Sequence, residues 1–215
     1  MKIAVLGGSF NPIHVGHLVL ADEVCSTLGY DKVLFIPAFV PPHKEMVGGF
    51  SARDRLEMTR LACEGDERFE AESCEIDRGG VSYTYDTICY LEEKYSSELE
   101  GKIALIMGSD LLPGFHLWHK AKELSEKCQL ILALRPDGGA KSSSSNKPKG
   151  DYANLDSNFD ASREELFKGA LHMDNPLLEI SSTEIRTRIA DGRSIRYLVP
   201  SLVFKYIRDM MEDNK

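Results

Sequence analysis

The sequence predicts an α/β protein, with a single domain built as a Rossmann-like, doubly wound parallel sheet. Four short runs are almost continuously apolar, which is typical of strands buried on both faces of a sheet. Helical patterns separate these runs, and alternation of strands and helices implies parallel strands. The 215 residues are enough for one sizeable hydrophobic core. The four predicted strands are Lys2–Leu6, Lys32–Pro37, Lys102–Met107 and Gln129–Leu134.

The predicted helices are marked by apolar spacing and by capping residues. Apolar residues recur at helical spacing from Leu18 to Leu28, and Gly29 suits the position just after a helix. Ser51 followed by Asp54 has the form of a capping box at a helix start. Further helical patterns cover Thr84–Tyr95, Arg163–Leu171 and Ser201–Met211. Another helix is expected to begin at Ser181, with Glu184 in its first turn, and to end before Gly192.

One stretch, Asp137–Asp160, departs from this pattern. It contains four consecutive serines, Ser142–Ser145, among glycine, lysine, proline and asparagine residues. Such a composition buries little apolar surface. We therefore expect a mobile loop over residues 137–160 rather than a boundary between two domains.

Charge and cysteine content restrict the class of protein. Acidic residues outnumber basic residues by 34 to 26, and the formal net charge is −8. A long-range basic field for nucleic acid is absent, so a small anionic substrate must be held by local groups. The apolar runs are too short to span a membrane. The five cysteines form no CxxC pair, which favours reduced thiols in a cytoplasmic protein.

A glycine turn and two histidines follow the first predicted strand, in the segment Gly7–His17. Ligands of parallel sheets bind beyond the carboxyl ends of strands, where glycines let the backbone approach a phosphate and the next helix offers free N–H groups. His14 and His17 are three residues apart on the first helical turn, so they share a face. Phosphate binding is the favoured interpretation. A metal pair, which would need a third protein ligand, and a purely structural turn remain alternatives.

Two motifs resemble those of a known family. The segment Gly7–His17, GGSFNPIHVGH, resembles the GGTFDPIHxGH signature of the bacterial nicotinate mononucleotide adenylyltransferases, in the HxGH nucleotidyltransferase superfamily. The segment Ile180–Arg186, ISSTEIR, resembles the second superfamily motif, ISSTxIR. Ser9 and Asn11 replace the commoner threonine and aspartate, and both keep a hydrogen-bonding group. The resemblance implies transfer of AMP from ATP to nicotinate mononucleotide, giving nicotinate adenine dinucleotide and pyrophosphate on the route to NAD.

Shorter matches extend this resemblance from Met1 to about Ile207, apart from the serine-rich stretch. They resemble segments that the nicotinate enzymes carry after their strands, including a ring-stacking tryptophan. The matching residues are Pro41–Lys44 (PPHK), Ser82–Thr84 (SYT), Gly108–Asp110 (GSD), Trp118 and the pair Arg135-Pro136.

The resemblance also implies roles for individual residues. His14 and His17 are the expected catalytic residues, which donate hydrogen bonds to the ATP phosphates where charge grows in the transition state. Mg²⁺ is expected to arrive with ATP, not in an all-protein metal site. The residues expected to bind ATP are Gly8, Ser9, Phe10, His14, His17, Gly108, Asp110, Ile180, Ser181, Ser182 and Arg186. Those expected to bind the acceptor are Lys44, Thr84, Trp118, His119 and Arg135.

Taken one at a time, four of these residues have simpler interpretations. A single lysine such as Lys44 is usually solvated, and Arg135 fits a surface charge. Trp118 by itself fits a core position, and Asp110 fits a helix cap. The flanking histidines of Trp118 and the match to the family favour binding roles instead.

Two other functions compete with this assignment. A sibling transferase would act on phosphopantetheine, glycerol phosphate or nicotinamide mononucleotide; the SYT turn and Trp118 are not expected in the first two. A regulatory module without catalysis would lack His17 or Arg186, and both are present. The expected partners are therefore ATP and nicotinate mononucleotide, with no nucleic acid and no membrane, and the formation of a homo-oligomer is left open.

Overall fold

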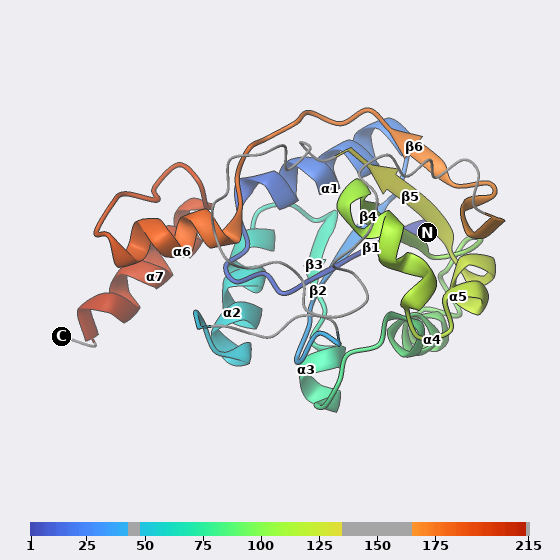
Figure 1. Ribbon diagram of the computed structural model, residues 1–215, viewed down its shortest axis with the longest axis horizontal. Coiled ribbons are helices and arrows are strands. Elements are labelled where there is room, and N and C mark those ends of the chain that lie inside the picture. Colours follow the sequence, from blue (N-terminus) through green and yellow to red (C-terminus); the bar gives the residue numbers. More distant parts are fainter. Residues whose placement is uncertain (43–47, 135–164, 214–215) are drawn as a thin grey trace.

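A six-stranded, all-parallel sheet forms the centre of the computed structural model, which describes residues 1–42, 48–134 and 165–213 (Figure 1). The strand order is β3-β2-β1-β4-β5-β6. The chain therefore starts in the middle of the sheet, winds outward to one edge, and then returns to wind toward the other. The predicted doubly wound fold is confirmed. The strands are β1 (Ile3–Gly8), β2 (Lys32–Pro37), β3 (Phe69–Ala71), β4 (Ala104–Gly108), β5 (Gln129–Ala133) and β6 (Leu171–Met173).

Helices cover both faces of this sheet. The α-helices are α1 (Val15–Leu28), α2 (Ala52–Cys63), α3 (Cys74–Arg78), α4 (Thr84–Lys94), α5 (Ala121–Lys127), α6 (Ser182–Ala190) and α7 (Ser201–Asp213), and the 3₁₀ helices are η1 (Ser109–Leu117) and η4 (Glu165–Phe167). Three predicted helix ends are confirmed in detail: Gly29 ends α1 with φ at +67°, and Ser51 and Ser181 cap α2 and α6. None of these helices is both long enough and apolar enough to cross a membrane.

Alternate residues of the central strands feed two separate cores. In β1, Ala4 and Leu6 pack into one core with Val24 of α1, whereas Ile3 and Val5 pack into the other with residues of α4 and β4. Side chains of a strand point to alternate faces, so a strand that is apolar at every position needs cover on both sides. This is why the apolar runs predicted strands correctly.

The predicted helix over Arg163–Leu171 is wrong in the part that the structure describes. Residues 165–167 form the short helix η4, and Leu171 already belongs to strand β6, which pairs with β5. Phe167 is buried against Phe115, with ring centroids 5.4 Å apart. The apolar residues here follow a helical spacing, but tertiary contacts with β5 and η1 decide the local structure.

Candidate active site

The carboxyl ends of β1 and β4 define the point at which the strand order reverses. β1 pairs with β2 on one side and with β4 on the other, and in such sheets a ligand crevice forms outside these strand ends. Gly7 and Gly8, predicted to follow the first strand, are its last two residues and pair with Ile36 and Pro37. β4 ends at Gly108. The sheet therefore brings Gly8 and Gly108, both expected to bind ATP, to neighbouring strand ends.

Phe10 gives the loop after β1 its shape. Its φ of +43° is unusual for a residue with a side chain, and its ring is buried. The ring meets the His17 ring edge-on, with centroids 5.0 Å apart. A Cβ on Gly8 would lie only 3.1 Å from the Phe10 ring. Glycine at position 8 thus makes room for the ring that supports His17.

The two histidines form one unit at the start of α1. His14 is the N-cap residue and His17 the third residue of the helix, and their rings stack with centroids 3.7 Å apart. The backbone N–H of His14 donates to Nδ1 of His17 at 3.2 Å. In a neutral His17 the proton must then sit on Nε2, which makes Nε2 a hydrogen-bond donor. The prediction that the two histidines share a face is confirmed.

Gly16 explains the spacing of the histidine motif. A Cβ at this position would lie 3.1 Å from Nδ1 and 3.2 Å from Cε1 of His14. Any larger residue would press on the His14 ring and displace it from the stack. The motif therefore needs both histidines and the glycine between them.

Three side chains from distant elements hold the carbonyl groups of this loop. Nη1 of Arg55 donates to the Ser9 carbonyl at 2.6 Å, and Nη1 of Arg186 donates to the Asn11 carbonyl at 2.8 Å. Oγ of Ser182 donates to the Pro12 carbonyl at 2.8 Å. In a trans peptide the N–H points opposite to the carbonyl, so fixing the Ser9 carbonyl also fixes the direction of the next N–H. The loop is thus held from α2 on one side and from α6 on the other.

Asn11 ties the same loop to the segment that enters α2. Its Nδ2 donates to the Gly48 carbonyl at 3.1 Å, and its Oδ1 accepts from the Phe50 N–H at 2.9 Å. Gly49 lies between them with φ at +95°, and a Cβ there would be 2.4 Å from Oδ1 of Asn11. An amide supplies both the donor and the acceptor that this contact uses, whereas an ionised aspartate only accepts.

The second motif lies against the first, as its expected role requires. Ser181 caps α6, and Ser182 and Arg186 contact the loop after β1. Ser182 and Arg186 donate to backbone carbonyl groups of this loop. Nη2 of Arg186 also donates to Oγ1 of Thr183 at 3.2 Å. Burial lowers the pKa of Arg186 below its ordinary value, but an arginine remains charged. Direct contacts of Ile180, Ser181, Ser182 and Arg186 with ATP stay a prediction.

Asp110 does not cap a helix. The N-cap of η1 is Gly108, and Asp110 lies in the first turn of η1 with an exposed side chain. Its position just beyond the end of β4 is compatible with the expected contact to a ribose.

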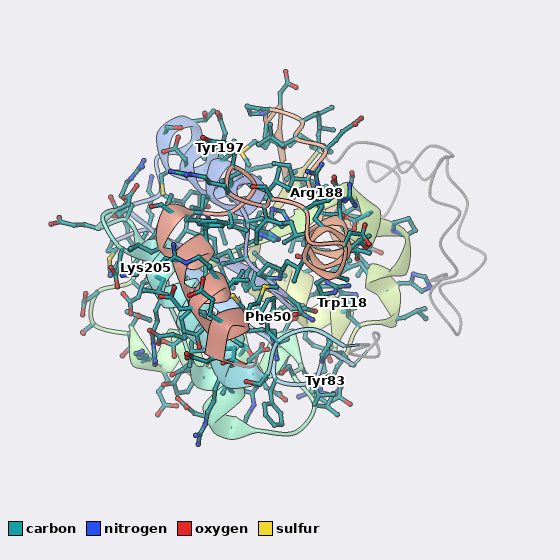
Figure 2. The ribbon with its side chains drawn as sticks, turned by 90° about the vertical axis from the view of Figure 1, so that its left-hand side faces the viewer. Phe50, Tyr83, Trp118, Arg188, Tyr197 and Lys205 are labelled. Atoms are coloured by element: carbon teal, nitrogen blue, oxygen red, sulfur yellow. The ribbon has the colours of Figure 1, made fainter. Side chains whose placement is uncertain are left out.

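The residues expected to bind the acceptor come from the ends of α4 and η1. Thr84 is the first residue of α4, and Trp118 follows η1. The ring of His119 lies 4.7 Å from that of Tyr83, centroid to centroid, so the two segments meet. Trp118 is half-buried and packs on Phe115, with centroids 5.3 Å apart; Figure 2 shows it below Arg188 of α6.

The Ser82–Thr84 turn also meets the segment that follows β2. Oγ of Ser82 accepts from the Phe39 N–H at 3.0 Å, and the Ser82 N–H donates to the Val40 carbonyl at 2.9 Å. The predicted PPHK segment begins directly after Val40. Lys44 and Arg135, both expected at the acceptor, lie outside the described residues, as does the whole serine-rich stretch, residues 137–160.

Sequence reasoning missed Arg55. Its side chain is 1% exposed although arginine is seldom buried. A signal was present: Arg55, Thr59 and Ala62 follow one another at helical spacing, and all three are buried in α2. This spacing would have placed Arg55 on the inner face of the helix.

Comparisons with known proteins identify the family. The sequence profile of the "Cytidylyltransferase-like" family matches residues 5–188. A protein of Treponema pallidum (strain Nichols), named "Probable nicotinate-nucleotide adenylyltransferase", is 42% identical over 207 residues, covering 96% of each chain. A protein of the same name from Borreliella burgdorferi is 35% identical over 209 residues, covering 97% of this chain and 95% of its own.

A solved structure supports the fold. Nicotinic acid mononucleotide adenylyltransferase of Plasmodium falciparum, complexed with NaAD, superposes with a TM-score of 0.68 at 17% identity, covering 97% of this chain and 95% of its own. The family assignment rests on the two sequence relatives, which are 42% and 35% identical over nearly the full chain. The chain therefore belongs to the cytidylyltransferase-like family and, within it, to the nicotinate-nucleotide adenylyltransferases.

Proposed function

We propose that this chain transfers AMP from ATP to nicotinate mononucleotide, giving nicotinate adenine dinucleotide and pyrophosphate in NAD biosynthesis. The observation that carries the proposal is the stacked pair of His14 and His17 at the helix start beside β1. It lies at the sheet position where ligands of such folds bind, and relatives of nearly full length carry the corresponding name.

The chemistry asks for positioning more than for a strong base. The acceptor phosphate is ionised near neutral pH, and one of its oxygens attacks the α-phosphorus of ATP while the bond to pyrophosphate breaks. Such transfers are catalysed mainly by alignment and by electrostatic stabilisation. The Nε2–H of His17 and the N-terminal end of α1 meet this need, because both favour growing negative charge on phosphate oxygens.

The remaining residues divide between the two substrates. For ATP we propose Gly8, Ser9, Phe10, His14, His17, Gly108, Asp110, Ile180, Ser181, Ser182 and Arg186. For nicotinate mononucleotide we propose Lys44, Thr84, Trp118, His119 and Arg135. The contacts of Ser82 with Phe39 and Val40 support this division, because they join the turn that contains Thr84 to the residues just before Pro41.

A divalent cation, which we propose to be Mg²⁺, accompanies ATP. Among residues 1–42, 48–134 and 165–213, no group of three or more histidine, cysteine, aspartate or glutamate side chains is arranged to hold a metal. An ion that is held mainly by phosphate oxygens and water needs no such group of side chains. The ion would neutralise charge on the phosphates, while the chain itself orients them through α1 and the loop after β1.

The chain is proposed to work in the cytoplasm. All five cysteines are free thiols, and four of them are buried. Thiols that stay reduced are typical of a reducing compartment.

Product identification tests the proposed function. Purified protein is incubated with ATP, Mg²⁺ and, in separate reactions, nicotinate mononucleotide, nicotinamide mononucleotide, phosphopantetheine or glycerol 3-phosphate, and a reaction without acceptor is the control. Mass spectrometry should find nicotinate adenine dinucleotide and an equal amount of pyrophosphate. A product from phosphopantetheine or glycerol 3-phosphate alone would assign the chain to a sibling activity.

A further inference from the structure

Arg55 is a buried cation between the two loops that leave the centre of the sheet. Its Nη1 donates to the Ser9 carbonyl, just beyond β1, and its Nη2 donates to the Phe39 carbonyl, just beyond β2, at 3.3 Å. Both carbonyls lie at the carboxyl edge of the sheet, where the ligand crevice forms. One guanidinium group thus joins the histidine loop to the segment that leads to the acceptor residues.

No carboxylate compensates this charge among the residues that the structure describes. Arg55 forms no ion pair there, and its Nε is buried without a hydrogen-bond partner in the same residues. Burial lowers the pKa of Arg55 below its ordinary value. The guanidinium stays protonated, because arginine does not lose its proton in proteins.

Within the described residues the guanidinium is thus buried with carbonyl partners alone, and such burial of a charge is costly. A purely structural link between two carbonyls could be made by a neutral donor. The charge instead raises the local potential behind the Ser9 peptide, in a chain whose formal net charge is −8. Arg186 of α6 contributes a second partly buried cation to the same loop, where it binds the Asn11 carbonyl.

We propose that Arg55 is a positioning residue of the ATP site, which clamps the Ser9 and Phe39 carbonyls together and places a fixed positive charge behind the loop that receives the phosphates. The inference rests on the proposed function, because it takes the ATP phosphates to lie at this loop. Arg55 does not touch ATP itself. It acts on the phosphates chiefly through the field of its charge, which water screens much less at a buried site than at the surface.

The test separates the charge from the packing of the side chain. Arg55→Gln removes the charge but keeps a donor, Arg55→Lys keeps the charge but loses the fork, and Arg60→Gln is the matched control on α2. Arg60 is exposed and pairs only with Glu57 among the described side chains. Dissociation constants are measured for ATP with Mg²⁺ by calorimetry and for adenosine by competition, and folding is checked by circular dichroism.

The account predicts a selective loss of affinity for the charged ligand. Arg55→Gln should weaken ATP binding by about tenfold or more and change adenosine binding by less than about twofold, because only ATP presents phosphates to the buried charge. Arg55→Lys should bind ATP within about threefold of the native protein even if its melting temperature falls, because the charge remains. Arg60→Gln should match the native protein for both ligands.

Three results would overturn the inference. They are an equal loss of affinity for adenosine and ATP, an equal loss in the glutamine and lysine variants, and unchanged ATP affinity in folded Arg55→Gln. If the glutamine variant does not fold, a lysine variant that folds and loses ATP affinity tenfold contradicts the inference by itself. Failure here is distinct from failure of the proposed function, because ATP binding is measured without an acceptor.

Discussion

The backbone N–H of His14 donates to Nδ1 of His17 at 3.2 Å, and the two rings stack 3.7 Å apart. This relationship fixes the tautomer of His17 through the same helix turn that fixes its position. When His17 is neutral, the donor that we propose for the phosphates, Nε2–H, is therefore set by the fold. Preorganised donors of this kind stabilise transition-state charge without rearrangement at the moment of reaction.

Removal of the His17 donor should affect the chemical step. His17→Ala should lower kcat by a factor on the order of 10²–10³ and change KM for ATP much less. The measurement is steady-state kinetics on protein with native circular dichroism. Unchanged kcat in the folded variant would contradict a role in transition-state stabilisation, and a tightly bound metal lost with this change would favour the ligand interpretation.

The contact between Asn11 and the segment before α2 should matter for stability. Asn11→Ala removes the partner of the Gly48 carbonyl and of the Phe50 N–H, which are only partly buried, and should cost roughly 1–2 kcal/mol of unfolding free energy. Asn11→Asp keeps the acceptor for Phe50 and should lose less. Urea denaturation of the three proteins measures the series, and an alanine variant as stable as the native protein would show that this contact is unimportant.

The cysteines should differ in reactivity because only Cys89 is not buried. Burial raises the pKa of Cys25 to about 11 and the pKa values of Cys63, Cys74 and Cys128 to about 12. Near pH 8 these four thiols are protonated and protected, so iodoacetamide should modify Cys89 first. Peptide mass spectrometry measures the five rates. Similar rates at all five sites in native protein would contradict the described burial.

The stretch Asp137–Asp160 should contribute little to stability. Its composition predicts little buried apolar surface, and deletion of the Ser142–Pro148 part should leave the melting temperature nearly unchanged. Differential scanning calorimetry compares the two proteins. A fall of many degrees would mean that an ordered element lies in this stretch.

Local patterns in the sequence were enough to predict the centre of the fold but not its edges. β1, β2, β4 and β5 are long apolar runs, whereas β3 and β6 have three residues each and gain their structure from pairing with a neighbour. Helix α3, with five residues, was missed for the same reason. Short elements carry too little periodicity to be recognised without their tertiary contacts.

The candidate site, too, could be predicted from the sequence only in part. The histidine motif and the motif of α6 are contiguous in sequence, so both could be found, and the structure brings them together through Ser182 and Arg186. The partners that hold the loop are distant: Arg55 is 46 residues from Ser9, and Phe50 is 39 residues from Asn11. No local pattern links such pairs, and only the spacing of Arg55 on the inner face of α2 gave a signal.

The choice of acceptor tests the central claim most directly. The nicotinate carboxylate only accepts hydrogen bonds, whereas the nicotinamide amide places an NH₂ donor where one oxygen would be. We expect backbone N–H groups at Thr84 and His119 to meet this group, so an amide would leave buried donors unpaired at roughly 1–3 kcal/mol each.

The measurement is kcat/KM for nicotinate mononucleotide and nicotinamide mononucleotide at saturating ATP, for the native protein and for Trp118→Ala. Two mismatched donors predict a preference for the nicotinate acceptor on the order of 10² or more. Trp118→Ala should weaken both acceptors with little change in their ratio, because a stacked ring does not distinguish acid from amide. Comparable kcat/KM values for the two acceptors in the native protein would contradict the assignment to the nicotinate branch.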